Sequence, residues 1–96
     1  MPTNEDDMEE AYQKILFEIN KKIIQYTLSQ IQDLGLEVDN LRDFMKGYYV
    51  SKFVLFLTII HKQHDNPHID NPILFQEYLK KIISSEKLKG LLDELL

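Results

Sequence analysis

The sequence predicts an all-α protein, an antiparallel helical bundle of three long helices plus a short C-terminal helix. Two observations carry this prediction. Apolar residues recur at intervals of three and four along most of the chain, as one face of a helix requires, and alternating strand patterns are missing. Gly35 and the two Asn-Pro steps at 66–67 and 71–72 divide the apolar segments into separate helices.

The first segment predicts one continuous helix over residues 5–34. Its main apolar stripe is formed by Met8, Tyr12, Ile15, Leu16, Ile19, Ile23 and Tyr26. Gly35 can adopt the left-handed conformation after Leu34, and Leu36 can then contact Ile31, which is typical of a Schellman ending.

The remaining segments predict three more helices. The second is capped by Asp39 or Asn40 and runs to about residue 63, and the short connection before it makes the first two helices antiparallel neighbours. Its expected inward side holds Leu41, Phe44, Met45, Tyr48, Tyr49, Leu55, Phe56 and Ile59. Residues 64–71 form an Asn-Pro loop, Pro72 begins the third helix, and a kink or a short fourth helix begins near Ser85.

Composition and charge limit the function classes. A chain of 96 residues makes a single domain, 1–96, and 44% hydrophobic residues provide it with a core. Five acids among the first ten residues account for the net charge of −5, and residues 1–7 are interpreted as an acidic N-terminal helix cap. The neutral remainder disfavours nucleic-acid binding. No cysteine, no secretory signal and no apolar run of membrane-spanning length is present, so we expect a cytoplasmic protein without membrane insertion.

Two predicted helices carry more apolar residues than one small bundle obviously needs. The predicted second helix has a further apolar stripe of Val50, Phe53, Val54 and Leu57, and the first has one that includes Ile24 and Leu28. We therefore predict a non-enzymatic protein-protein interaction module that uses these six residues, as a homodimer or as a subunit, inhibitor or adaptor of a larger partner. Two alternatives stay open: a closed monomer whose last helices cover the stripes, and a monomer that acts through its acidic N-terminal segment.

His61, His64 and His68 are the only residues with the character of a metal site. His61 and His64 are one helical turn apart, and Asp65 or Asp70 could complete a site for Zn²⁺ or Ni²⁺. A small metal-binding protein is therefore the alternative function. No glycine-rich phosphate loop or nucleophile motif occurs, so we expect neither catalysis nor a cofactor.

Overall fold

The computed structural model describes residues 5–61 and 72–96, with the side chains of Glu5 and His61 outside the description, and every element in these ranges is helical. The helices are α1 (Glu5–Glu18), α2 (Lys21–Asp33), α3 (Leu41–His61), α5 (Pro72–Ile83) and α6 (Glu86–Leu95). The all-α prediction is confirmed. The predicted loop 64–71 and residues 1–4 of the predicted N-terminal cap lie outside the described residues.

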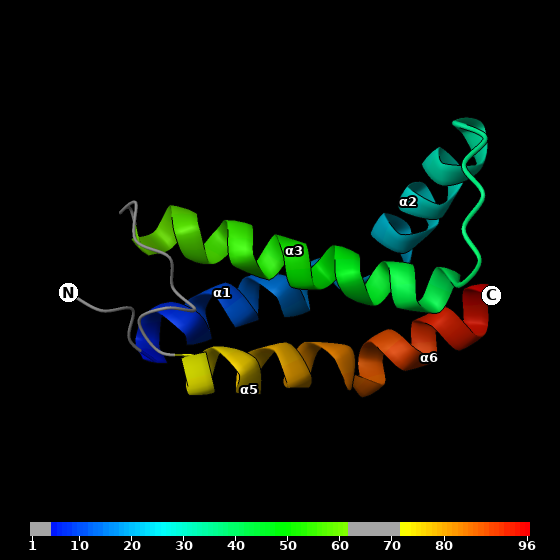
Figure 1. The fold of residues 1–96 in the computed structure, drawn as a ribbon. Coiled ribbons are helices and arrows are strands. Elements are labelled where there is room, and N and C mark those ends of the chain that lie inside the picture. The colour runs from blue at the N-terminus through cyan, green and yellow to red at the C-terminus, as the bar shows by residue number, and fades with distance from the viewer. Residues whose placement is uncertain (1–4, 62–71) are drawn as a thin grey trace.

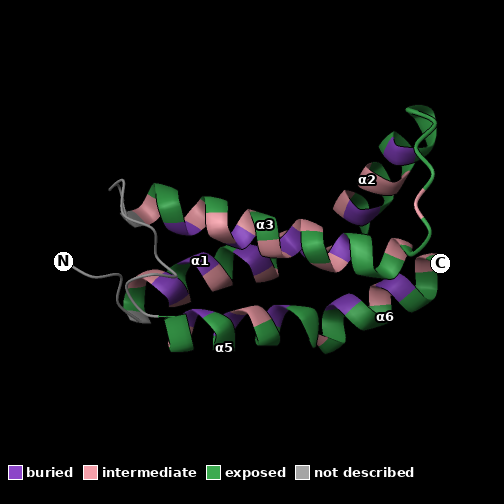
Figure 2. Cartoon of the chain, in the orientation of Figure 1, coloured by how far each residue is buried: buried purple, intermediate pink, exposed green. Residues whose placement is uncertain are grey.

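Helices α1, α3 and α5 pack against one another and form the centre of the molecule. In Figure 1 they run side by side, α6 continues from the end of α5, and α2 leans away from α3 at one end. The buried side chains line the inner sides of these helices (Figure 2). The core contains Met8, Ala11, Ile15, Ile19, Ile24, Met45, Tyr49, Phe53, Leu57, Phe75, Tyr78, Ile82, Leu88 and Leu92.

The predicted helix 5–34 is broken in two, which corrects the sequence interpretation. Asn20 has an extended backbone and caps α2, because its side-chain oxygen accepts a hydrogen bond of 2.9 Å from the amide of Ile23. Its side-chain nitrogen donates to the carbonyl of Phe17 at 3.3 Å. The break turns Ile24 and Ile31 inward, although a continuous helix would place them about 160° away from the buried side of α1.

Two distant side chains donate hydrogen bonds to carbonyl groups at the end of α1, which also accept from the nearby amides of Ile19 and Asn20. The hydroxyl of Tyr49 on α3 donates to the carbonyl of Glu18 at 2.8 Å, and the ammonium group of Lys87 on α6 donates to the carbonyl of Leu16 at 2.9 Å. Burial, followed by the nearby Tyr48 and Glu18, raises the pKa of Tyr49. The hydroxyl therefore stays protonated and remains a donor.

The other helix boundaries follow the local signals in the sequence. Gly35 has a φ of 70°, and the amides of Gly35 and Leu36 donate to the carbonyls of Gln32 and Ile31, which is the predicted Schellman ending. Asn40 caps α3 by accepting from the amide of Asp43 at 3.0 Å. Ser85 caps α6, so the short C-terminal helix is confirmed.

Charged groups attach α6 to the other helices and α1 to α5. The pairs Lys21–Glu94 and Arg42–Asp93 are both 2.6 Å long and half exposed, so each contributes little on its own. Between α1 and α5, the Tyr78 hydroxyl donates to the Glu9 carboxylate at 2.6 Å. Hydrogen bonds from Tyr78 and then from Gln13 lower the pKa of Glu9 despite a small opposing effect of burial.

Replacing Asn20 with alanine tests the cap at the break. Asn20→Ala removes the acceptor for the amide of Ile23, so we expect it to lower the free energy of unfolding by about 1 kcal/mol. Asn20→Asp keeps that acceptor and should keep most of the stability. Urea unfolding followed by circular dichroism measures both variants, and equal stabilities would contradict the assigned role of this side chain.

The contact between Glu9 and Tyr78 predicts a pH dependence of stability. Because the folded state lowers the pKa of Glu9 below 4.5, the stabilisation is complete above that pH and is lost as the pH falls towards the folded value. As the pH is lowered from 5 to 3, about two units, the free energy of unfolding should therefore decrease less in Glu9→Gln than in the wild type. Tyr78→Phe removes the donor and should flatten the profile in the same way, and an unchanged slope in both variants would argue against this contact.

Candidate functional site

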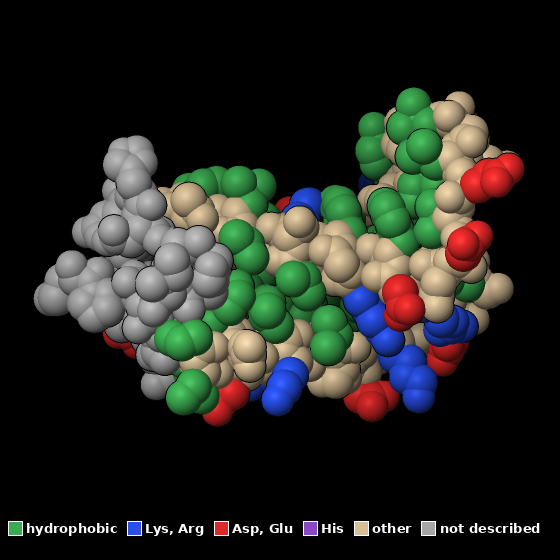
Figure 3. Space-filling model, viewed as in Figure 1, with side chains coloured by type: hydrophobic (Ala, Val, Ile, Leu, Met, Phe, Trp, Pro, Cys, Tyr) green, Lys and Arg blue, Asp and Glu red, His purple; other side chains and the backbone are tan. Residues whose placement is uncertain are grey.

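The structure places the predicted contact residues mainly inside the molecule. Phe53, Leu57 and Ile24 are completely buried, whereas Val50, Val54 and Leu28 are half-buried and pack against the core. Phe53, Leu57 and Ile24 therefore cannot meet a partner on the surface of this fold, which corrects the sequence prediction. Hydrophobic side chains do reach the surface along the junction of α3 and α5 (Figure 3).

The aromatic side chains of α5 explain why the side of α3 that carries Phe53 is buried. The ring of Phe53 stacks on that of Tyr78 with centroids 5.9 Å apart and an interplanar angle of 17°, and it contacts Phe75 at 5.9 Å. Tyr49 and Leu57 lie one turn before and one turn after Phe53, and they are buried as well. The chain therefore covers the stripe that we had expected to be free.

The opposite side of α3 is the one left uncovered. There an exposed surface, which we call the outer seam, extends for about four turns. It contains the exposed residues Phe44, Gly47, Ser51, Leu55, Thr58 and Ile59, together with the half-buried Tyr48, which packs against the core. Leu55 and Ile59 are 54% and 59% exposed, and Phe44 is also exposed, although all three had been expected to face inward. The charged residues of α3 lie outside this set, so the seam is solvent-facing yet uncharged.

Lys52 lies at the edge of the outer seam, where it interacts with Glu18 and Tyr48 of the same chain. The ammonium group of Lys52 lies 3.7 Å from the Glu18 carboxylate and 5.1 Å from the centre of the Tyr48 ring. Burial alone would lower the pKa of Lys52, but Tyr48 and Glu18 outweigh it and raise the pKa above its ordinary value. The charge of Lys52 is thus balanced within the chain.

A groove between α2 and α3 adjoins the outer seam. It has a volume of about 570 Å³ and is lined by Lys22, Ile23, Tyr26, Thr27, Gln30, Tyr48 and Lys52. Tyr26 is 67% exposed on α2. The groove shares Tyr48 with the seam, and Figure 1 shows that α2 leans away from α3.

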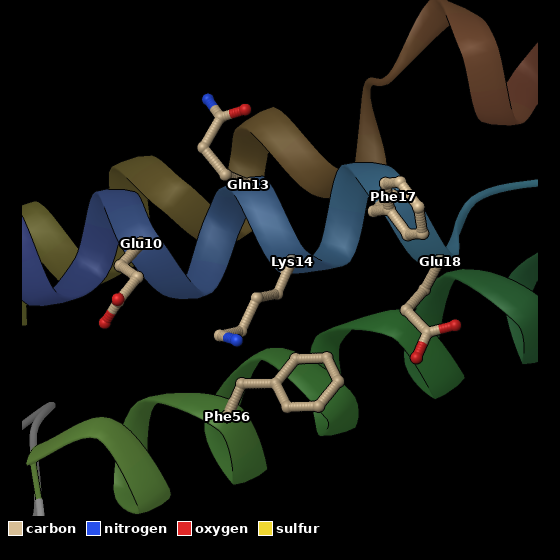
Figure 4. A pocket seen from close by; sticks show the side chains of 6 residues that line it. All are labelled: Glu10, Gln13, Lys14, Phe17, Glu18 and Phe56. Carbon is tan, nitrogen blue, oxygen red and sulfur yellow. The ribbon is translucent and has the colours of Figure 1, made fainter.

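A second groove lies between α1 and α3. It measures about 590 Å³ and is lined by Glu10, Gln13, Lys14, Phe17, Glu18 and Phe56. In Figure 4 the side chains of Lys14 and Phe56 point towards one another across the groove. Apart from Glu18, its polar side chains are exposed to solvent, so the groove offers no enclosed place for a reaction.

The predicted metal ligands fall outside the described part of the chain. This holds for the side chain of His61 and for all of His64 and His68. Among the described residues, no three histidine, aspartate or glutamate side chains gather in a way that could hold a metal ion. The metal-binding alternative therefore stays a prediction.

Comparisons with family models, curated proteins and solved structures give no match to this chain. Within residues 5–61 and 72–96, no helix combines the length and hydropathy needed to cross a bilayer. The outer seam with the adjoining α2–α3 groove is the candidate site that the geometry supports best.

Alanine substitutions on the two sides of α3 distinguish core from surface. Phe53→Ala leaves a cavity between α3 and α5, so we expect it to lower the free energy of unfolding by about 3–5 kcal/mol. Leu55→Ala changes an exposed side chain, and in dilute protein its effect should stay within about 0.5 kcal/mol. Denaturant unfolding of both variants measures the difference, and a larger loss for Leu55→Ala would reverse the assignment of the two faces.

Proposed function

We propose that this protein is a non-enzymatic protein-protein interaction module whose docking surface is the outer seam of α3. The partner that fits is a helix with an uncharged apolar stripe. One observation carries the proposal: a four-turn helix face lies open to solvent without a charged side chain, in a protein of which 28% of the residues are charged. Figure 3 shows hydrophobic side chains along the outer edge of α3 and over α2, with a basic and an acidic side chain between them on the edge of α3.

The energetics favour a covered seam. Leaving a large apolar side chain in water instead of burying it forgoes roughly 1.5–3 kcal/mol. Other exposed apolar residues, such as Phe17 at 84% and Ile73 at 75%, belong to α1 and α5 rather than to α3. Single residues of this kind are common on protein surfaces. A contiguous apolar face is typical of an interaction site.

The backbone that carries the seam is held firmly from behind. Met45, Tyr49, Phe53 and Leu57 anchor α3 in the core, so the seam side chains project from a helix that is already formed. A preformed helix loses little conformational entropy when a partner docks. This supports a binding role that needs no rearrangement of the bundle.

A photoreactive amino acid at position 55 tests the proposal in cells of the source organism. With the probe in place of Leu55, irradiation should give one or a few discrete adducts, because the side chain at this position then lies against a partner helix. The matched control carries the probe in place of Ile73, which is exposed on α5 and outside the seam. An absence of adducts at position 55, or the same adduct pattern at both positions, would overturn the proposed function.

A further inference from the structure

We propose that a basic pocket between α3 and α6 binds a small organic molecule that carries a phosphate monoester group. The pocket shares no residue with the outer seam, so this proposal does not depend on the proposed function. It is carried by a cavity, by the charges that line it and by a lysine for which the chain supplies no partner.

The basic pocket lies where the first turns of α3 face the junction of α5 and α6. Its volume of about 410 Å³ is within the range of small-molecule sites. It is more enclosed than the two grooves beside α3 described above. Its cationic lining residues are Arg42, Lys46 and Lys89, and its apolar ones are Ile83, Leu88 and Leu92.

The lining of the pocket has an excess of two positive charges, because Glu86 is the carboxylate that accompanies its three cations. Glu86 is the first residue of α6, where a carboxylate interacts favourably with the positive end of the helix. Figure 3 shows basic side chains gathered where α3 faces α6, with acidic side chains beside them. In a chain with a net charge of −5, this local excess favours an anion at the pocket.

Lys46 gives the most direct indication of a ligand. Within residues 5–61 and 72–96, the half-buried lysines are Lys46 and Lys52. Lys52 has Glu18 and the Tyr48 ring as partners. The ammonium group of Lys46 forms no ion pair or hydrogen bond with any described residue. Because partial burial removes hydration from this charge and no carboxylate compensates it, an anion in the pocket would stabilise it.

Arg42 and Ser85 add hydrogen-bond donors to the pocket. One N–H group of the Arg42 guanidinium donates to the Asp93 carboxylate at 2.6 Å, in an ion pair that is half exposed. The other N–H groups of Arg42 remain available to a ligand. The hydroxyl oxygen of Ser85 accepts from the amide of Leu88, and its proton remains available for donation.

A phosphate monoester suits this set of donors better than a carboxylate does. It carries about −1.5 to −2 charges at pH 7 and has three terminal oxygens, so it balances the excess charge and accepts hydrogen bonds on several sides. A carboxylate has a single charge and two oxygens in one plane. Ile83, Leu88 and Leu92 add apolar contacts for an organic substituent on the phosphate.

The charge of the chain favours a free molecule over a lipid headgroup, which offers the same phosphate chemistry. Asp93 and Glu94 are exposed on α6 about one turn beyond Lys89. These carboxylates and the net charge of −5 oppose the approach of an anionic bilayer, whereas a small anion can enter the pocket by itself.

Titration of the full chain with n-butyl phosphate, followed by ¹H–¹⁵N NMR, tests the proposal. Shift changes should concentrate in the amides of residues 42–46 and 83–89, with a Kd of about millimolar order because the probe is small. Butanol lacks the charge, butyrate lacks the phosphate, and inorganic phosphate lacks the alkyl group. Each should bind at least about fivefold more weakly. Equal binding of any of the three would overturn the assignment of an organic phosphate.

Variants that remove one cation locate the binding site. Lys46→Gln and Lys89→Gln should each weaken the binding of butyl phosphate by about tenfold, because each removes a charged donor. Lys89 is exposed, so its replacement leaves the fold intact, and circular dichroism verifies the helix content of both variants. The matched control Lys14→Gln removes a cation from the α1–α3 groove and should bind within about twofold of the wild type. Unchanged binding in both pocket variants, or an equal loss in the control, would overturn the proposed site.

Co-sedimentation with vesicles of phosphatidylcholine and phosphatidic acid distinguishes the two sources of phosphate. We expect the wild type to remain in the supernatant, because the carboxylates beside the pocket oppose an anionic surface. Sedimentation of the wild type with these vesicles that is lost in Lys46→Gln would assign the pocket to a lipid headgroup and overturn the free ligand.

Discussion

The hydrogen bond from the buried Tyr49 hydroxyl to the carbonyl of Glu18 joins the middle of α3 to the point where α1 ends. The same carbonyl also accepts a hydrogen bond of 3.0 Å from the amide of Asn20, so α1 ends here without an unsatisfied carbonyl group. The chain then turns at Asn20, and α2 leaves the bundle instead of continuing along α3.

α6 interacts with both sides of the turn between α1 and α2. Lys87 of α6 donates to the carbonyl of Leu16, and Glu94 pairs with Lys21 at the first residue of α2. The exposed ion pair contributes little energy, but the buried Ile24 beside it adds apolar contacts that surface charges cannot provide. The C-terminal helix therefore bridges the two sides of the bend.

Local signals predicted most of the fold, and tertiary packing decided the rest. Gly35, Asn40 and Ser85 each mark a helix end through an interaction with nearby backbone, so their roles can be read from the sequence. Asn20 is also a favoured cap, but the apolar spacing continues past it and favoured an unbroken helix. Both sides of α3 are apolar, and periodicity alone cannot distinguish them. Phe75 and Tyr78, more than twenty residues away, select the side that holds Phe53.

If the outer seam binds a partner as proposed, that binding is linked to the stability of a small domain. A chain of 96 residues buries a smaller share of its surface than a larger protein does, so its folded state has little free energy to spare. A partner that binds only the folded chain adds stability in proportion to the logarithm of its concentration. Because the seam is backed directly by Met45, Tyr49 and Phe53, contacts made on its outer side hold the helix that organises the core. Under the proposed function, docking on α3 therefore stabilises the bundle as well.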